Sequence, residues 1–167
     1  SRAIKDLKTS DLKDGNVLIK IDYSSLNYKD ALILKDGGKI VRKFPFVPGI
    51  DFSGKVVESG DDKFKKDENI ICTGFRVGEM YYGGFSQYAK VDSNFLIKNP
   101  KNIDAVQSMM LGTAGFTALQ CSFAIKAREE LLLGEKVNDV LVTGATGGVG
   151  SIAVMVLSKM GYNVHAV

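Results

Sequence analysis

The stretch VLVTGATGGVG, residues 140–150, is the most informative part of this chain. A short apolar strand stops at a glycine cluster, and an apolar-periodic segment begins straight afterwards. Glycines are needed where a chain turns sharply, where backbone approaches a pyrophosphate and where helix packs closely on strand, while the new helix offers free N–H groups to phosphates. The pattern GxGxxG occurs here as Ala145, Gly147 and Gly150. It predicts the opening of a dinucleotide-binding βαβ unit, with an ordinary glycine-rich turn of a parallel α/β domain as the alternative.

The segment after the glycines has the periodicity of a helix. From Val149 to Met160 apolar residues recur at i, i+3, i+4, i+7, i+8 and i+11, and Gly161 is a suitable stop. A second strand is expected from Asn163 to Val167. The residue that selects between a ribose 2′-hydroxyl and a 2′-phosphate lies about 20 residues beyond the glycines, at or past the end of this strand. A parallel sheet also needs further strands, so we expect a fragment of a longer polypeptide, or the ordered part of one.

The first half of the chain has a different pattern, in which short strand-like runs alternate with glycine-containing turns. The runs fall at residues 17–21, 54–58, 70–73, 86–91 and 95–97. Such spacing predicts a small β-rich domain. The mixed charges of residues 61–68 are expected to form a solvated loop.

A helical connector is predicted between these two parts. Asn99-Pro100-Lys101 ends the β-rich region, and residues 104–111 and 116–126 have helical patterns separated by the glycine-containing residues 112–115. The predicted domains are a β-rich domain at residues 1–102, a connector at 103–137 and an incomplete nucleotide-binding domain at 138–167.

Composition excludes several classes of protein. Hydrophobic residues make up 45% and charged residues 25%, as in ordinary globular proteins, and the net charge of +3 is scattered, which argues against nucleic-acid binding. No apolar run approaches the roughly 20 residues that cross a bilayer and no secretion-type leader begins at Ser1, so a cytoplasmic location is expected. Cys72 and Cys121 are interpreted as two reduced, buried thiols. His165 is the single histidine, which excludes a His-based metal cluster and suggests a structural role in its strand.

Five motifs carry a resemblance to a known family. They are SSLNYKDAL at residues 24–32, FPFVPGIDFSG at 44–54, YYGGFSQYA at 81–89, GTAGFTA at 112–118 and TGATGGVGS at 143–151. Together they resemble the medium-chain dehydrogenase/reductase superfamily, in its zinc-free branch of quinone oxidoreductase-like proteins and acrylyl-CoA reductases. The resemblance implies an α/β fold, with a GroES-like β-rich catalytic domain followed by the start of a Rossmann-type doubly wound parallel sheet. By the family's pattern, a strand before Ser1 and a long segment after Val167 are missing.

No metal is expected. Zinc alcohol dehydrogenases of this superfamily place a cysteine ligand at the position of Asn27 and a His-Glu pair at the positions of Ile50 and Asp51, and neither Asn nor Ile replaces a thiolate and an imidazole. The closely spaced cysteines of the structural zinc lobe are also absent from the sequence. Without a Lewis acid, hydride is expected to go to an already activated acceptor, such as an α,β-unsaturated thioester or a quinone.

Four residues are predicted to be catalytic: Asn27, Tyr28, Asp30 and Asp51. Hydride transfer to Cβ of an enoyl thioester builds negative charge on the thioester oxygen and requires a proton at Cα. The Asn27 amide or the Tyr28 phenol would donate to that oxygen, while the two carboxylates orient these groups or relay protons. The resemblance implies that Asn27, Asp30 and Asp51 face the nicotinamide. Alternatively, Asn27 and Asp30 cap a helix that starts at about Tyr28, and Asp51 only holds a loop after Pro48-Gly49.

The cofactor-binding residues are predicted from the glycine stretch and, through the resemblance, from the GTAGFTA segment. They are Thr113, Thr117, Thr143, Ala145, Thr146, Gly147, Gly148, Val149 and Gly150. The alternative for GTAGFTA is a flexible joint between two helices. Tyr81 and Tyr82 either line a substrate cleft or pack at a turn.

The expected function is that of a zinc-free, NADPH-dependent oxidoreductase that reduces the C=C bond of a small activated alkene, such as acrylyl-CoA or another short enoyl-CoA. The preference for NADPH rests on the resemblance alone. The alternatives are an NADPH:quinone oxidoreductase and a nucleotide-binding protein without turnover. The expected partners are the small-molecule substrate, enoyl-CoA or quinone, and a second copy of the complete protein in a homodimer, with no nucleic acid and no membrane. Residues 1–167 alone are expected to be inactive.

Overall fold

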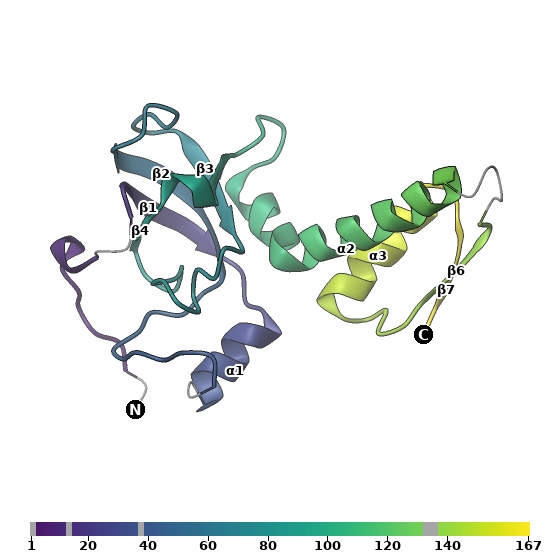
Figure 1. Cartoon of the computed structure of the whole chain (residues 1–167), viewed down its shortest axis with the longest axis horizontal. Coiled ribbons are helices and arrows are strands. Elements are labelled where there is room, and N and C mark those ends of the chain that lie inside the picture. Colours follow the sequence, from purple (N-terminus) through teal and green to yellow (C-terminus); the bar gives the residue numbers. More distant parts are fainter. Residues whose placement is uncertain (1–2, 13–14, 37–38, 132–136) are drawn as a thin grey trace. The chain divides into compact units, whose positions relative to one another are not determined.

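The computed structural model describes residues 3–12, 15–36, 39–131 and 137–167. It divides into two compact units, Ser1–Gly112 and Thr113–Val167. The first unit contains a sheet, a short helix and the beginning of a long helix, and in the second unit the rest of that helix and another helix lie beside a pair of strands (Figure 1).

The first unit is built on an antiparallel sheet of five strands in the order β4-β1-β2-β3-β5. The strands are β1 (Val17–Ser24), β2 (Asp51–Ser59), β3 (Asn69–Thr73), β4 (Tyr88–Val91) and β5 (Leu96–Lys98). All five runs that the sequence predicted overlap these strands, and the predicted fold class is confirmed. Two 3₁₀ turns, Thr9–Asp11 and Ser93–Phe95, complete the regular structure together with the helix α1 (Tyr28–Asp36).

The core of this unit lies on one face of the sheet. Val17 and Ile19 alternate with more exposed residues on β1, as expected of an antiparallel strand with one buried face. They pack in one apolar cluster with side chains from the other strands, among them Phe52, Ile70 and Val91. Burying each such side chain contributes about 1.5–3 kcal/mol. The first four residues of β2 are all buried, so Asp51 at its start is buried as well.

The strand register brings the end of β1 beside the start of β2. Ser24 pairs with Phe52, and on the other side of β2 Asp51 pairs with Thr73. The chain leaves β1 at Ser24 and enters α1 at Tyr28. The short β1–α1 connection therefore runs past Asp51.

The helix α2 (Ala105–Leu131) is interrupted at Gly112, whose φ of 47° and ψ of −152° are not helical. The predicted break at residues 112–115 is thus confined to one residue, because Gly115 continues the second helical part. In the described part of the chain, α2 alone is long and apolar enough to cross a membrane, contrary to the expectation that no segment reaches that length. The core helix of a soluble protein passes the same test, and this helix is broken at Gly112.

The second unit contains the predicted strand–turn–helix–strand. The strands β6 (Asp139–Val142) and β7 (Asn163–Ala166) are parallel, with α3 (Gly148–Lys159) between them in the chain. Gly161 follows the end of α3 with a φ of 92°, which confirms the predicted stop, because the left-handed region suits glycine.

The sequence made predictions about the surroundings of the two cysteines and of His165. Cys72 is buried as expected, but Cys121 is exposed, because it lies on α2, whose apolar stretch is mostly not buried. His165 is exposed on β7, and its Nε2 lies 2.9 Å from Oδ1 of Asp139 on β6. That hydrogen bond is the main cause of the lowered pKa of Asp139.

Candidate functional site

Asp30 is fully buried and binds two backbone groups with its carboxylate. Its Oδ2 accepts from the N–H of Asn27 at 2.9 Å, and its Oδ1 accepts from the N–H of Ile50 at 3.0 Å. Asp30 is the third residue of α1, so the first of these bonds is the reach-back half of a capping box. The capping interpretation therefore describes Asp30, which also ties the start of α1 to the residue before β2.

The side chain of Asn27 does not cap the helix. Its Nδ2 lies 2.9 Å from Asp51 Oδ2 and 3.1 Å from Ser25 Oγ, and Ser25 Oγ lies 2.8 Å from the same Asp51 oxygen. Asp51 is fully buried at the start of β2. Three polar side chains from the end of β1, the β1–α1 connection and the start of β2 thus form one hydrogen-bonded cluster, which we call the Ser25–Asn27–Asp51 triangle.

The chemistry of the triangle fixes the direction of its bonds. An ionised carboxylate only accepts hydrogen bonds, so the nitrogen side of the Asn27 amide faces Asp51. The hydrogens of Nδ2 are therefore engaged within the triangle. Tyr28, the other hydrogen-bond donor that the sequence left open, is 80% exposed, and its phenol makes no hydrogen bond to the described residues.

Gly112 closes one side of the triangle within the first unit. A Cβ atom at this position would lie 2.7 Å from Asp51 Oδ2 and 3.0 Å from Ser25 Oγ, and its φ of 47° is strained for any residue with a side chain. Position 112 therefore requires glycine for both space and conformation. Ser25 was not predicted from the sequence, because its role depends on the register of β1 and β2; its place in the SSLNYKDAL motif was the available signal.

Cys72 is the pairing partner of Phe52, one residue beyond Asp51 along β2. Burial, and to a lesser extent the negative charge of Asp51, raises the pKa of its thiol to about 12. A thiol of that pKa is protonated at neutral pH and is a poor nucleophile. Cys72 is therefore part of the core rather than of the chemistry.

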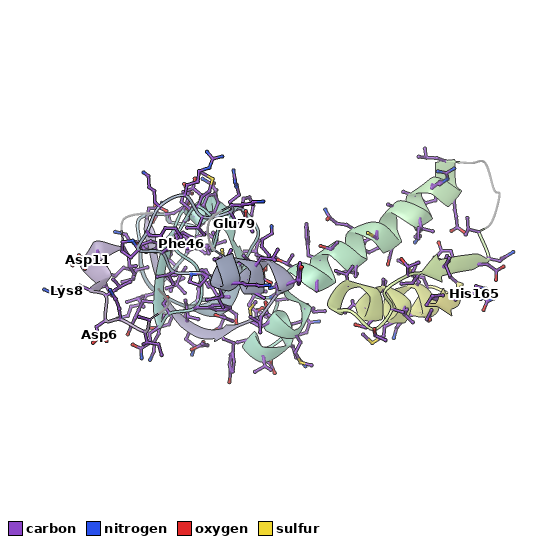
Figure 2. The ribbon with its side chains drawn as sticks, turned by 90° about the horizontal axis from the view of Figure 1, so that it is seen from below. Asp6, Lys8, Asp11, Phe46, Glu79 and His165 are labelled. Atoms are coloured by element: carbon purple, nitrogen blue, oxygen red, sulfur yellow. The ribbon has the colours of Figure 1, made fainter. Side chains whose placement is uncertain are left out.

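Tyr81 and Tyr82, which the sequence predicted either to line a substrate cleft or to pack at a turn, both pack against other aromatic rings. Tyr82 Oη donates to the carbonyl of Pro45 at 3.1 Å, and its ring contacts Phe46 edge-on at 5.9 Å. The ring centroids of Tyr81 and Phe95 lie 5.4 Å apart. Phe46 and Glu79 are labelled on this unit in Figure 2. Glu79 holds Lys29 of α1 at 2.7 Å, which connects the helix to the loop that carries the tyrosines.

The glycine turn of the second unit approaches the start of α3 closely. Gly144 has a φ of 64°, and a Cβ at Gly150 would lie 2.2 Å from the Gly144 carbonyl oxygen, so turn and helix approach as only glycine allows. The N-cap residue of α3, Gly147, offers no side-chain cap, which leaves the first N–H groups of the helix for a ligand. The residues of this turn therefore fit a dinucleotide.

The other predicted cofactor residues of this unit lie around the turn. Thr143 and Thr146 are exposed, Ala145 is half-buried, and of the first residues of α3 Gly148 and Val149 are exposed. A Cβ at Gly148 would lie 3.3 Å from the Cβ of Ala114, so the N-terminus of α3 packs on α2 next to Thr113. One helical turn further on, Thr117 Oγ1 donates to the Thr113 carbonyl at 2.8 Å. The structure thus gathers this predicted set at one end of the second unit.

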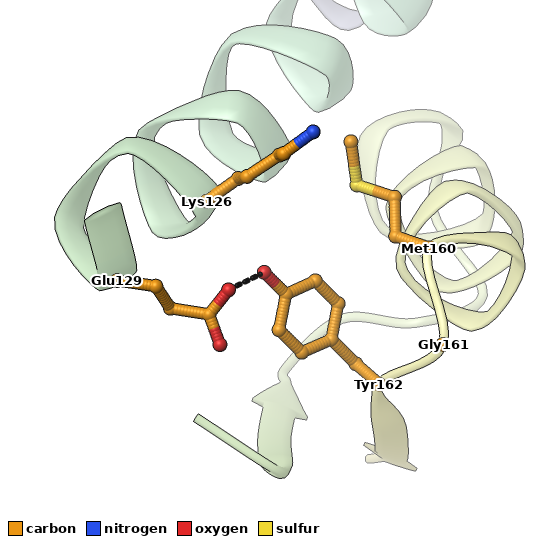
Figure 3. A pocket seen from close by; sticks show the side chains of 5 residues that line it. All are labelled: Lys126, Glu129, Met160, Gly161 and Tyr162. Atoms are coloured by element: carbon orange, nitrogen blue, oxygen red, sulfur yellow. Dashed lines mark hydrogen bonds between the residues drawn. The ribbon is translucent and has the colours of Figure 1, made fainter. Parts of the chain in front are cut away.

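An open pocket of about 270 Å³ lies elsewhere in the second unit and contains none of the predicted site residues. It is lined by Lys126, Glu129, Met160, Gly161 and Tyr162 (Figure 3). Tyr162 Oη donates to Glu129 at 2.6 Å, and this bond raises the pKa of the phenol to about 12. The Val137 N–H donates to the same carboxylate at 2.7 Å, so Glu129 joins α2 to the segments that lead into β6 and β7.

Among the described residues, no group of three or more His, Cys, Asp or Glu side chains is placed to hold a metal ion. The expectation of a metal-free site remains a prediction.

Comparison with known proteins places the chain in a family. The sequence matches the family described as "Alcohol dehydrogenase GroES-like domain" over residues 13–101. It is 47% identical over 99% of its length to the acrylyl-CoA reductase AcuI of Ruegeria pomeroyi and covers 49% of that protein. The structure superposes on the yhdH oxidoreductase of Salmonella enterica in complex with NADP with a TM-score of 0.90 and 43% identity, covering 98% of this chain and 50% of that one.

A second solved structure agrees with the first. The protein yhfP of Bacillus subtilis with NAD bound matches with a TM-score of 0.87 and 44% identity, over 98% of this chain and 49% of that one. The chain therefore belongs to the alcohol dehydrogenase GroES-like family within the medium-chain dehydrogenase/reductases. Its nearer relatives here are acrylyl-CoA reductase and quinone oxidoreductase-like proteins, and it spans about half of their length.

Proposed function

We propose that the full-length protein containing this chain is a zinc-free, NADPH-dependent reductase of the C=C bond of a small activated alkene, with a short enoyl-CoA such as acrylyl-CoA as substrate. The observation that carries the proposal is the 47% identity to a protein named acrylyl-CoA reductase along 99% of this chain. The chain's own residues support it, since Asn27 and Asp51, at two of the positions where the resemblance puts the cysteine and the His-Glu pair of zinc members, are hydrogen-bonded to each other.

The second unit supplies the dinucleotide site in this proposal. Free N–H groups at the start of α3 and the glycine turn at residues 143–147 bind the pyrophosphate, and Thr113 and Thr117 lie beside them. When bound, NADPH supplies the hydride that reduces the alkene carbon. The relatives of known structure were solved with NADP and with NAD, so the preference for the 2′-phosphate is part of the proposal.

The first unit supplies the groups that handle charge and protons. Negative charge develops on the thioester oxygen as Cβ is reduced, and a positioned hydrogen-bond donor stabilises it. The exposed phenol of Tyr28 is available for that bond, while Asp30 holds the backbone of the preceding Asn27 and Asp51 holds its amide. A proton is then delivered to Cα, for which the same phenol is the available acid.

A quinone oxidoreductase is the second candidate. A relative from Bacillus subtilis, 45% identical over 98% of this chain, is named a putative quinone oxidoreductase. A quinone accepts hydride without a metal, and the residues of the first unit do not discriminate against it.

The test is NADPH oxidation by the full-length protein after chelator treatment, with acrylyl-CoA and a benzoquinone assayed in parallel and NADH as a second reductant. We expect faster turnover of acrylyl-CoA and a loss of about 100-fold in kcat for Asp51→Asn, with Asp22→Asn as the matched change at an exposed site. Preference for the quinone would establish the second candidate. Loss of activity to the chelator would overturn the metal-free mechanism, and NADPH binding without turnover of either acceptor would indicate a nucleotide-binding protein.

The assembly of the protein is proposed together with its activity. We expect a cytoplasmic homodimer of the full-length protein, measured by light scattering, and no turnover by residues 1–167 alone. A fragment that oxidises NADPH as fast as the full-length protein would contradict the latter.

A further inference from the structure

Ser25 links Asn27 and Asp51, two of the four residues of the first unit that the sequence predicted to be catalytic. Its Oγ lies 2.8 Å from Asp51 Oδ2 and 3.1 Å from Asn27 Nδ2, and the third side of the triangle, Asn27 Nδ2 to Asp51 Oδ2, measures 2.9 Å. Ser25 is half-buried and immediately follows β1. No role is assigned to it by the activity proposed above.

The hydroxyl of Ser25 has a defined direction in this triangle. Because the Asp51 carboxylate only accepts, Ser25 donates its hydrogen to Asp51 and accepts one from the Asn27 amide. The amide nitrogen is then held at two points, the carboxylate and the hydroxyl. A single bond to Asp51 would leave the amide plane free to rotate about that contact.

The orientation decides which chemistry Asn27 offers. Because Nδ2 is turned toward Asp51 and Ser25, the carbonyl oxygen Oδ1 is the end of the amide that is left to bind another group. This oxygen makes no hydrogen bond to the described residues. Asn27 therefore presents an acceptor rather than a donor beside Tyr28. If the amide turned over, its carbonyl oxygen would face the buried carboxylate of Asp51, and two acceptors in contact repel.

The backbone keeps other groups away from the triangle on one side. A Cβ at Gly112 would lie 3.0 Å from Ser25 Oγ and 2.7 Å from Asp51 Oδ2, which leaves no space there for a side chain. Asp51 itself is fully buried. The buried carboxylate of Asp51 thus anchors the two half-buried side chains of Ser25 and Asn27.

We propose that Ser25 is a positioning residue that, together with Asp51, fixes the Asn27 amide with its carbonyl oxygen outward. The proposal rests on the proposed function for its effect on turnover, and on the triangle alone for its effect on the amide.

The kinetic test uses the full-length protein with Ser25→Ala, Ser25→Thr, Asn27→Ala and the double variant Ser25→Ala/Asn27→Ala, assayed with acrylyl-CoA and NADPH. We expect Ser25→Ala to lower kcat about tenfold with little change in the KM for the thioester, and Ser25→Thr to recover most of it because the hydroxyl is kept. In the Asn27→Ala background, Ser25→Ala should have no further effect. Wild-type turnover in Ser25→Ala, or an equal loss in both backgrounds, overturns the proposal.

A second measurement does not depend on turnover. The side-chain amide signals of Asn27 in the ¹⁵N–¹H spectrum are identified by their absence from Asn27→Ala, and their exchange with solvent is compared between variants. We expect slow exchange in the wild type and in Ser25→Thr, and faster exchange with shifted signals in Ser25→Ala. Unchanged signals in Ser25→Ala overturn the proposal. If the wild type does not reduce acrylyl-CoA, the proposed function fails while these signals still decide the role of Ser25.

Folding of each variant is checked by its thermal unfolding midpoint. If Ser25→Ala does not fold, Ser25→Cys takes its place in both measurements, since a thiol has a similar shape but is a weak hydrogen-bond donor and acceptor. The same outcomes then apply to the cysteine variant.

Discussion

The two predicted sites of this chain, one in each unit, are formed by different means. In the first unit, buried side chains form the predicted site: Asp30 binds two backbone N–H groups, and Asp51 accepts from Ser25 and Asn27. In the second unit, the backbone forms the predicted site. The helix α3 starts at the uncapped Gly147, and the preceding turn comes so close to Gly150 that no Cβ fits there. The first kind of site depends on the identity of each side chain, and the second depends on the absence of side chains. Substitutions should therefore damage the two units in different ways.

The largest effect is expected where the first unit loses a buried carboxylate. Asp30→Ala leaves the N–H groups of Asn27 and Ile50 without an acceptor in the protein interior, which costs about 3 kcal/mol or more. The measurement is the thermal unfolding midpoint of the full-length protein, with Asp22→Ala as the control at an exposed position of β1. An unchanged midpoint in Asp30→Ala would mean that the backbone, and not Asp30, holds this corner of the first unit.

The matching change in the second unit adds a methyl group instead of removing a charge. In Gly150→Ala the new Cβ would lie 2.2 Å from the Gly144 carbonyl oxygen, so the turn must shift away from the N-terminus of α3. We expect NADPH to bind at least about tenfold more weakly, measured by titration of the cofactor's fluorescence. Gly60→Ala, where the nearest atom is 3.3 Å away, is the control, and equal affinities for the two variants would contradict the role of the turn.

Part of the fold and of the predicted sites could be predicted from the sequence alone. The turn at residues 143–150 and the helix after it were predictable, because glycine spacing and apolar periodicity are local in the sequence. The β-rich half was predictable as strands, but the triangle was only partly so. Asn27 and Asp51 came from a resemblance, and Ser25 was missed, because only the pairing of Ser24 with Phe52 brings that end of β1 to Asp51.

In the connector, the sequence predicted a longer interruption of the helix than the structure has. Gly112 and Gly115 look alike in the sequence, yet only Gly112 leaves the helical conformation. The difference is tertiary, since it is at Gly112 that the backbone passes within contact distance of Asp51 and Ser25.

The two cysteines lie in different units and differ in their exposure to solvent. Cys72 lies in the core of the first unit with a pKa of about 12, whereas Cys121 is exposed in the second. We expect iodoacetamide at pH 8 to modify Cys72→Ser, which keeps Cys121, at least about 100-fold faster than Cys121→Ser. Similar rates for the two variants would show that the core around Cys72 opens readily.

The same thiol gives a stability that depends on pH. Its pKa is about 12 in the folded chain, against 9.0 as the ordinary value, so between these values the unfolded chain loses the proton while the folded chain keeps it. The contribution is complete below pH 9 and is lost as the pH rises toward 12, by up to about 1.4 kcal/mol per pH unit. Cys72→Ala should show a correspondingly flatter decline in unfolding free energy. Parallel declines would indicate that the thiol ionises in the folded state.

The smallest effect is expected at the surface of the first unit. Glu79→Gln removes the 2.7 Å ion pair with Lys29 and the looser one with Arg76 at 3.8 Å, which together contribute at most about 1 kcal/mol because both cations are exposed. The difference in thermal midpoint should shrink further in about 0.5 M salt, because interactions between surface charges are well screened at that ionic strength. A large, salt-independent loss would place Glu79 among the structural carboxylates with Asp30.

The backbone bonds of Asp30 also have an evolutionary consequence. Positions 27 and 50 are the ones where the resemblance puts a cysteine and a histidine in zinc alcohol dehydrogenases, and Asp30 holds both through main-chain N–H groups that every residue but proline possesses. The side chains at these positions can therefore change while the loops that carry them stay anchored. A lineage built on this scaffold can exchange metal chemistry for metal-free chemistry through a few substitutions, without having to invent a new fold.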